Sequence, residues 1–186
     1  NFQINPSIDD EKGYNIDLGL RTNRSKVFLL DFSLFHLFYN NRIGTVWVTQ
    51  SNVSNFPGIN STAPYFQIRT NVSKSRTYGA ELLAEINWIK LFTNKEATKR
   101  LTTFLNLSTI DARYVSSDEP AYDNKKVELV PPVTVRIGLS VGNDKFSASY
   151  QFSYVNEHYS DATNAVTHPH GIVGLIPSYN VMDISL

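Results

Sequence analysis

The sequence of 186 residues contains no cysteine and has no long hydrophobic run. Without cysteine, a disulfide framework, a thiolate zinc site and a cysteine nucleophile are excluded. The longest apolar runs, at 27–30 and 172–176, are far shorter than the roughly 18 residues that a membrane-spanning helix needs. The sequence also has no excess of charge of one sign, since 17 basic side chains balance 17 acidic ones. No electrostatic field therefore favours nucleic acid, and we expect no nucleic-acid partner.

Apolar and polar residues instead alternate with a period of two, which is typical of strands with two different faces. In the first such segment Tyr14, Ile16, Leu18 and Leu20 alternate with Asn15, Asp17, Gly19 and Arg21. Similar segments lie at 28–37, 77–88, 101–108, 133–141, 146–154 and 179–186, so the sequence predicts seven strands. In the second one Phe35 and Leu37 fall on the polar phase and His36 on the apolar phase, which leaves its facing open beyond the midpoint.

The predicted connections alternate between short and long. Three long polar segments, at 45–64, 116–130 and 156–178, follow every second strand, and short turns join the others. Outer-membrane barrels have this layout, with short periplasmic turns and long extracellular loops. We therefore expect the three long segments to lie at one end of a single sheet.

Charged residues stand on the polar phase of the predicted strands, opposite the apolar stripe. A soluble β-sandwich also alternates, but it does not readily place charges at mid-strand with aromatic residues such as Tyr14, Trp88, Phe146 and Tyr154 near the strand ends. The pattern thus favours an all-β fold, a transmembrane antiparallel meander from an outer-membrane barrel. The side chains expected to face the lumen, or a plug inside it, are Asp17, Arg21, Asp31, Glu81, Glu85, Arg136 and Asp183.

Five segments of the sequence can be compared with motifs of a known family. They are NPSIDDEKGYNIDLGLR (5–21), TYGAELLAEINW (77–88), STIDARYV (108–115), VPPVTVRIGLSV with FSASYQFSYVNEHYSDATN (130–141 and 146–164), and GLIPSYNVMDISL (174–186). In this order they resemble motifs of the TonB-dependent outer-membrane receptors, and within that family the branch of ferric-citrate receptors. The resemblance covers nearly the whole chain. It implies a barrel of roughly 22 strands that is closed by an N-terminal plug domain.

Under this resemblance, residues 1–186 form a fragment of a single barrel domain in the bacterial outer membrane, roughly its fourteenth to twentieth strands, without the plug. The chain begins at Asn1 without an initiator methionine and ends at Leu186 within an apolar run. Both ends therefore also suggest a cut chain. The implied partners are a ferric chelate, the TonB complex acting through the plug region, and outer-membrane lipid with lipopolysaccharide. No cofactor is expected, because iron would pass only as part of the transported chelate.

Candidate ligand-binding residues lie in the predicted extracellular segments. Imidazole, phenol and guanidinium groups can donate hydrogen bonds to an anionic chelate. The candidates are Arg69, His158, Tyr159, Asp161, His168 and His170. The histidines of THPHG (167–171) are more simply interpreted as loop residues than as metal ligands, so no metal site is expected. Lys74 and Arg113, near the outer rim, could contact either lipopolysaccharide phosphates or the ligand.

Two classes of function remain open from the sequence. The first is TonB-dependent uptake of a ferric chelate, either ferric citrate or a siderophore, and the second is a non-transporting outer-membrane barrel or a secreted β-rich binding or adhesion module. An enzyme is not expected, because Glu157, Asp161 and Asn164 come without a nucleophile and base that could complete a catalytic arrangement. The uptake hypothesis also predicts that deleting residues 162–171 stops uptake and leaves the barrel folded.

Overall fold

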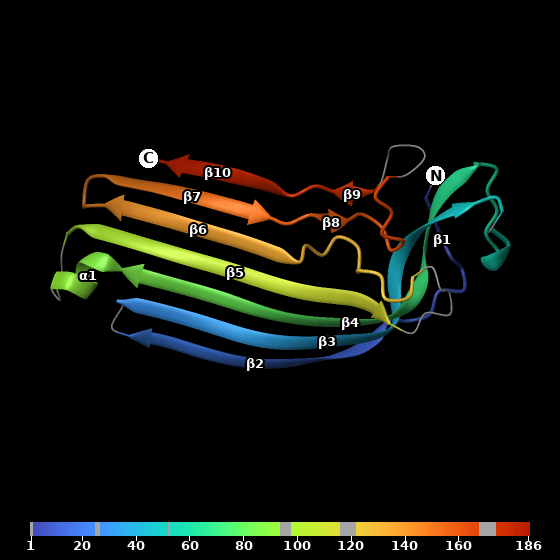
Figure 1. Cartoon of the computed structure of the whole chain (residues 1–186), viewed down its shortest axis with the longest axis horizontal. Coiled ribbons are helices and arrows are strands. Elements are labelled where there is room, and N and C mark those ends of the chain that lie inside the picture. The colour runs from blue at the N-terminus through green and yellow to red at the C-terminus, as the bar shows by residue number, and fades with distance from the viewer. Residues whose placement is uncertain (1, 25–26, 52, 94–97, 116–121, 168–173) are drawn as a thin grey trace.

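The computed structural model describes residues 2–24, 27–51, 53–93, 98–115, 122–167 and 174–186. Seven strands form one antiparallel sheet in sequential order, from β2 at one edge to β10 at the other (Figure 1). The strands are β2 (Lys12–Arg24), β3 (Phe28–Thr49), β4 (Tyr65–Asn87), β5 (Arg100–Val115), β6 (Val133–Gly142), β7 (Ser147–Val155) and β10 (Tyr179–Ser185). β3, β5 and β7 all end at the same end of the sheet, where the long connections lie (Figure 1). The predicted meander is therefore confirmed.

The register of the sheet separates apolar from polar side chains. One row of paired residues across six strands reads Leu20, Phe32, Leu82, Leu107, Val135 and Tyr154, and the adjacent row, on the opposite face, reads Arg21, Asp31, Leu83, Asn106, Arg136 and Ser153. Large side chains on the apolar face are open to the surroundings, with Leu18 72% and Ile184 74% exposed. A soluble monomer rarely leaves such a continuous apolar surface uncovered.

The sequence left open which way the second half of the predicted strand 28–37 faces. In β3 the alternation of the first half continues through these residues. Phe35 lies on the polar face and covers Gly79, where an added Cβ would come within 2.1 Å of the phenyl ring. Phe104 covers Gly138 in the same way. His36 lies on the apolar face and stacks on Tyr78, with ring centroids 4.5 Å apart. Two of the apolar residues on the polar face, Phe35 and Phe104, thus fill space left by glycine on a neighbouring strand.

The prediction of a loop over 45–64 was wrong at its beginning. Thr45–Thr49 belongs to β3 and pairs with the start of β4, so the connection spans only 50–64 and contains the 3₁₀ turn η1 (Val53–Asn55). The short turn after β4 carries an unpredicted helix, α1 (Trp88–Thr93). A short strand, β1 (Phe2–Ile4), pairs in parallel with β4 outside the meander, and β8 (His158–Tyr159) pairs with β9 (Leu175–Ile176).

Aromatic side chains mark both ends of the apolar face. Trp88 stacks on Phe92 at the short-turn end and donates a hydrogen bond of 2.9 Å from Nε1 to Thr103. Tyr14, Phe38 and Tyr78 lie at the long-loop end. About ten residues separate Tyr78 from Trp88, which at about 3.3 Å per residue and a tilt of about 40° span about 25 Å, the height of the apolar band of an outer-membrane barrel. No helix among the described residues has the length and apolar character to cross a membrane.

Candidate ligand-facing site at the long-loop end

The outer ends of β3 and β4 form a bent hairpin, defined here as residues 42–73. The bend follows Asn41, whose φ of 53° lies in the left-handed region, and coincides with a shift in the β3–β4 register. Beyond it the two strands turn away from the long direction of the sheet (Figure 1). Their buried face forms a small core with the end of β5, residues 122–127 and Ala162. The core consists of Val46, Val48, Ile59, Phe66, Ile68, Val72, Ala112, Tyr114, Tyr122, Val127 and Ala162.

The segment that resembles the family motif at 5–11 holds the bent hairpin through side-chain amides. Asn5 donates a hydrogen bond from its backbone N to the Arg69 carbonyl at 3.0 Å and another from Nδ2 to Thr70 Oγ1 at 2.9 Å. Asn71 reciprocates, because its Oδ1 accepts a hydrogen bond from the Asp9 backbone N at 2.7 Å and its Nδ2 donates to the Asp9 carbonyl at 3.0 Å. The motif therefore positions the hairpin.

Glu11 joins this segment to the bend itself. Its carboxylate accepts a hydrogen bond from Arg42 Nη1 at 2.7 Å and another from the Ile43 backbone N at 3.0 Å. Burial acts to lower the pKa of Arg42, but the hydrogen bond and negative charge of Glu11 outweigh it and the pKa is raised. Arg42 is thus held as a cation beside the bend.

A second carboxylate, that of the half-buried Glu128, lies beside the core of the bent hairpin. It accepts a hydrogen bond of 2.6 Å from the Tyr114 hydroxyl. Burial, together with the negative charge of Glu128, raises the pKa of Tyr114 above that of a free phenol, so the hydroxyl stays a donor. Gly44 packs against this pair, and a Cβ there would lie 2.8 Å from both the Tyr114 hydroxyl and Glu128 Oε1. Only glycine fits this position without displacement of the pair.

The segment SDATN anchors a neighbouring loop. Asn164, with φ of 55°, accepts a hydrogen bond of 2.6 Å from the Lys126 backbone N on its Oδ1 and donates one of 2.8 Å from Nδ2 to the Lys126 carbonyl. Asp161 is 1% exposed, and its Oδ1 accepts a hydrogen bond of 2.8 Å from the Thr163 backbone N. Residues 161–164 therefore fix the path of the chain around Lys126.

The predicted ligand-binding residues are not gathered into one cluster. Arg69 is exposed on the bent hairpin, and its backbone pairs with Thr45 and Ile4. His158 and Tyr159 are half-buried in β8, where His158 Nδ1 lies 3.0 Å from the Asn156 carbonyl. Asp161 is buried and cannot reach a chelate in this conformation, because its carboxylate serves the turn that it begins. His168 and His170 lie outside the described residues.

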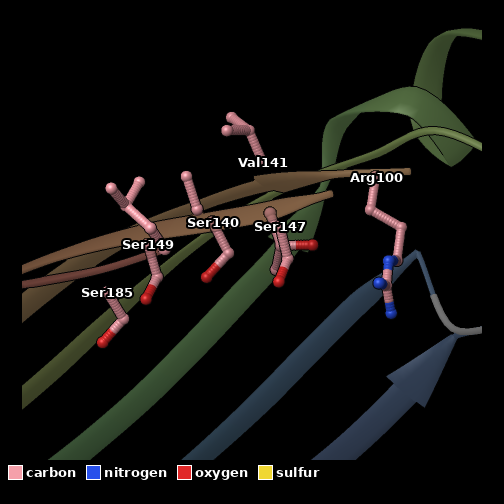
Figure 2. Close-up of a pocket in the computed structure, with 9 residues that line it drawn as sticks. Arg100, Ser140, Val141, Ser147, Ser149 and Ser185 are labelled. Carbon is pink, nitrogen blue, oxygen red and sulfur yellow. The ribbon is translucent and has the colours of Figure 1, made fainter. Parts of the chain in front are cut away.

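The polar face of the sheet is hollowed at two places between β5 and β10. Figure 2 shows Ser140, Ser147, Ser149 and Ser185 pointing to the same side as Arg100, with Val141 pointing the other way. This hollow, near the short-turn end, measures about 460 Å³. A second hollow of about 460 Å³ lies closer to the loops and is lined by Asn106, Thr134, Arg136, Gln151, Ser153 and Asp183 among others.

The charged residues of the polar face differ in how they are paired. Arg21 donates to Asp31 on the neighbouring strand, at 2.7 Å from Nε to Oδ2. Asp17 accepts a hydrogen bond from Asn15 on its own strand. Glu81, Glu85, Arg136 and Asp183 make no side-chain hydrogen bond or ion pair with another described residue. All seven share the face opposite the apolar surface, as their alternation predicts.

Solved structures with the same fold include two transporters and an uptake receptor. The ferric citrate transporter FecA in the unliganded form aligns over 94% of this chain with a TM-score of 0.67 and 17% identity, and the copper transporter OprC over 96% with a TM-score of 0.66 and 17% identity. The ferric yersiniabactin uptake receptor FyuA from Yersinia pestis aligns over 94% with a TM-score of 0.60 and 16% identity. The chain spans only 22–23% of the length of these three proteins.

A family model described as "TonB dependent receptor-like, beta-barrel" matches residues 1–186, the entire chain. No curated protein matches this chain by sequence. The meander, its apolar outer surface and the long loops at one end agree with this match. The chain belongs to the β-barrel family of the TonB-dependent receptors, which are outer-membrane proteins.

Proposed function

We propose that this chain forms part of the wall and extracellular loops of a transporter for TonB-dependent uptake of a ferric chelate, either ferric citrate or a siderophore. In this proposal the polar face lines the lumen and contacts a plug domain, and the apolar face contacts lipid. TonB acts through the plug region and not through these residues. Iron enters as part of the cargo, and the chain itself holds no cofactor.

The observation that supports a plugged lumen most strongly is the state of the polar face. Glu81, Glu85, Arg136 and Asp183 lack partners within the described residues, and Arg136 and Asp183 line the hollow that lies closer to the loops. Once water is excluded, unpaired carboxylates and guanidinium groups are costly, so a domain that fills the lumen must bring complementary groups. Side chains of this kind have no such need in an empty, hydrated channel.

The chelate enters, in this proposal, past the long-loop end. Arg69 offers an exposed guanidinium on the bent hairpin, and His158 and Tyr159 offer polar atoms from the third long loop. Arginine binds carboxylate and other planar anions through two parallel hydrogen bonds, which suits an anionic chelate. His168 and His170 remain candidates from the sequence. Asp161 is better placed to hold the loop than to bind a ligand.

The rival proposal is a barrel of the same family that imports nothing. A secreted sandwich is not compatible with the seven strands lying in a single sheet whose apolar face is exposed. A non-transporting barrel shares the fold and the outer-membrane location, so the two proposals differ only in transport. Dependence of uptake on TonB separates them.

Charge reversal at Arg69 tests the route of entry. In the full-length receptor, Arg69→Glu should lower uptake of radiolabelled ferric citrate about tenfold, because a charge-assisted hydrogen bond contributes about 1.5–3 kcal/mol and the new carboxylate repels the anion. Initial uptake rates are measured in cells of equal receptor content, with and without TonB. Lys145→Glu, an exposed charge reversal in the turn at the opposite end, serves as the control.

Normal TonB-dependent uptake by Arg69→Glu would remove Arg69 from the proposed entry route. An uptake rate that does not depend on TonB in the parent receptor, for citrate and siderophore chelates alike, would favour the non-transporting barrel. Deletion of residues 162–171, the test suggested by the sequence, is unsuitable because Ala162 is buried in the hairpin core and Asn164 holds Lys126. That uptake stops while the barrel stays folded remains a prediction, but these contacts mean that the deletion would also remove packing from the hairpin core.

A further inference from the structure

Basic side chains form a row across the apolar face of the sheet at its long-loop end. Phe38 pairs with Arg76, Arg76 pairs with Arg113, and Arg113 forms a β-bridge with Lys126. Directly paired residues of an antiparallel ladder place their side chains on the same face. Arg76, Arg113 and Lys126 therefore stand side by side on the face that the apolar strand residues share.

Two more cations extend this row in the direction of the loops. Lys74 lies two residues beyond Arg76 on β4, and Lys12 lies two residues before Tyr14 on β2, so both share the same face. The outer basic row is defined here as Lys12, Lys74, Arg76, Arg113 and Lys126. Among the described strand residues beside it on this face, Asp111 is the one carboxylate, and it accepts a hydrogen bond of 2.9 Å from Arg113 Nε.

The protein itself leaves most of this charge uncompensated. Arg76 lies over the ring of Tyr78, with Cζ 5.1 Å from the ring centroid, and forms no ion pair with a described residue. Like charges placed directly opposite each other on neighbouring strands are destabilising. The backbone of Lys126 is nevertheless fixed beside Arg113 by both hydrogen bonds of Asn164. An arrangement that is unfavourable alone becomes favourable when an anion lies across the row.

The position of the row along the strands indicates which anion this is. Tyr14, His36, Phe38 and Tyr78 form an aromatic cluster directly below it, with Tyr14 stacked on Phe38 at 5.5 Å and His36 stacked on Tyr78. Such aromatic residues mark the boundary of the apolar band, and Trp88 marks the other boundary about 25 Å away. The cations thus stand at the level of the outer-leaflet head groups and on the outside of the barrel, away from the lumen.

We infer that the outer basic row is a binding site for the phosphate groups of lipopolysaccharide, with the aromatic cluster below it contacting the acyl chains. Guanidinium groups bind phosphate through paired hydrogen bonds, and Arg76 and Arg113 present two of them together. This assignment also separates Lys74 and Arg113 from the chelate, because they lie on the lipid side of the wall. It does not rest on the uptake of any particular cargo.

The test uses the full-length receptor, purified and exchanged into detergent, with deep-rough lipopolysaccharide that carries both lipid A phosphates as the probe. The variant Arg76→Gln, Arg113→Gln and Lys126→Gln should bind this probe at least about tenfold more weakly than the parent, since each charge-assisted hydrogen bond contributes about 1.5–3 kcal/mol before solvent screening. Dephosphorylated lipid A should bind the parent and the variant equally. The matched control is Arg24→Gln, Lys90→Gln and Lys145→Gln, at the short-turn end, which should bind as the parent does.

A heat-modifiable shift in electrophoretic mobility confirms that each barrel is folded. A second variant, Arg76→Lys with Arg113→Lys, keeps the charges and should retain most of the binding even if the glutamine variant folds poorly. Equal binding by the parent and a folded glutamine variant would overturn the inference. An equal loss of lipopolysaccharide binding in the control variant would also overturn it. So would inorganic phosphate that saturates the row and is not displaced by lipopolysaccharide.

Discussion

Replacing Leu82 by arginine should lower the free energy of unfolding of the full-length barrel by about 2–4 kcal/mol, because the side chain lies near the middle of the lipid-facing surface. Leu82 pairs with Phe32 and Leu107 within the apolar rows, and it stands roughly halfway between Tyr78 and Trp88. The side chains directly beside it on this face, Ala80, Ala84, Phe32 and Leu107, offer no acceptor for a guanidinium. The charge must therefore be buried in hydrocarbon or reach a distant head group.

The matched control for this substitution is Thr109→Arg. Thr109 lies on the same face, is exposed, and stands nearer the long-loop end, where the cost of an arginine falls to about 0–1 kcal/mol. Reversible unfolding of each variant in phospholipid vesicles gives the two free energies. Equal costs for Leu82→Arg and Thr109→Arg would mean that this face does not lie against the bilayer with the depth assigned to it.

Removing the carboxylate of Glu11 should release the bent hairpin while leaving the sheet intact. Glu11→Ala leaves Arg42, whose side chain is only 33% exposed, without its ion-pair partner. It also removes the acceptor of the hydrogen bond from the Ile43 backbone N–H. An uncompensated, partly buried charge and a lost charge-assisted hydrogen bond together cost about 2–3 kcal/mol after allowance for exposure to solvent. This corresponds to about 30- to 150-fold faster opening of the hairpin base.

Hydrogen exchange at the Ile43 amide measures that opening directly, because this amide donates the hydrogen bond that Glu11 accepts. The control is Asp10→Ala, which removes an exposed carboxylate from the adjacent position. Amides of Leu82 and Leu107, in the middle of the sheet, should exchange as slowly in Glu11→Ala as in the parent. Unchanged exchange at Ile43 in that variant would show that the family motif does not hold the hairpin through Glu11.

Most of the sheet could be predicted from the sequence because each strand has one apolar face and one polar face, which meet different surroundings. The period of two then survives in nearly every strand, and it fixed the seven strands and their order. It became ambiguous at Phe35 because the sequence does not show that Phe35 covers Gly79 on the next strand. A glycine opposite an aromatic residue is visible only once the register is known.

The bent hairpin was missed because its composition is typical of loops. Asn, Ser, Gly and Pro dominate 50–64, yet Val46 and Val48 continue the alternation of β3, and Phe66 and Ile68 begin that of β4. These four residues were the available signal. The bend after Asn41 could not be predicted, since asparagine tolerates a positive φ without requiring it.

The candidate site was only partly predictable for a similar reason. Asn5, Glu11, Asp161 and Asn164 belong to segments that resemble family motifs, but their roles depend on hydrogen bonds to backbone that is distant in sequence. Asp161 looked like a ligand-binding carboxylate because it lies in a polar loop, and the structure buries it. The basic row likewise emerged only from the register, which brings Arg76, Arg113 and Lys126 together from three separate segments.

The most direct test of the two-faced wall is a nitroxide scan along β4 in the full-length receptor, in outer-membrane lipid. Spin labels are attached to single cysteines at 80–85 in this chain, which has no cysteine of its own, after any cysteine elsewhere in the receptor has been replaced by serine. Labels at Ala80, Leu82 and Ala84 should collide with dissolved oxygen in the bilayer and be shielded from a water-soluble nickel chelate. Labels at Glu81, Leu83 and Glu85 should show less oxygen contact, so that oxygen contact alternates with a period of two. The opposite phase, or the absence of any alternation, would contradict the assignment of the apolar face to lipid and the charged face to the lumen.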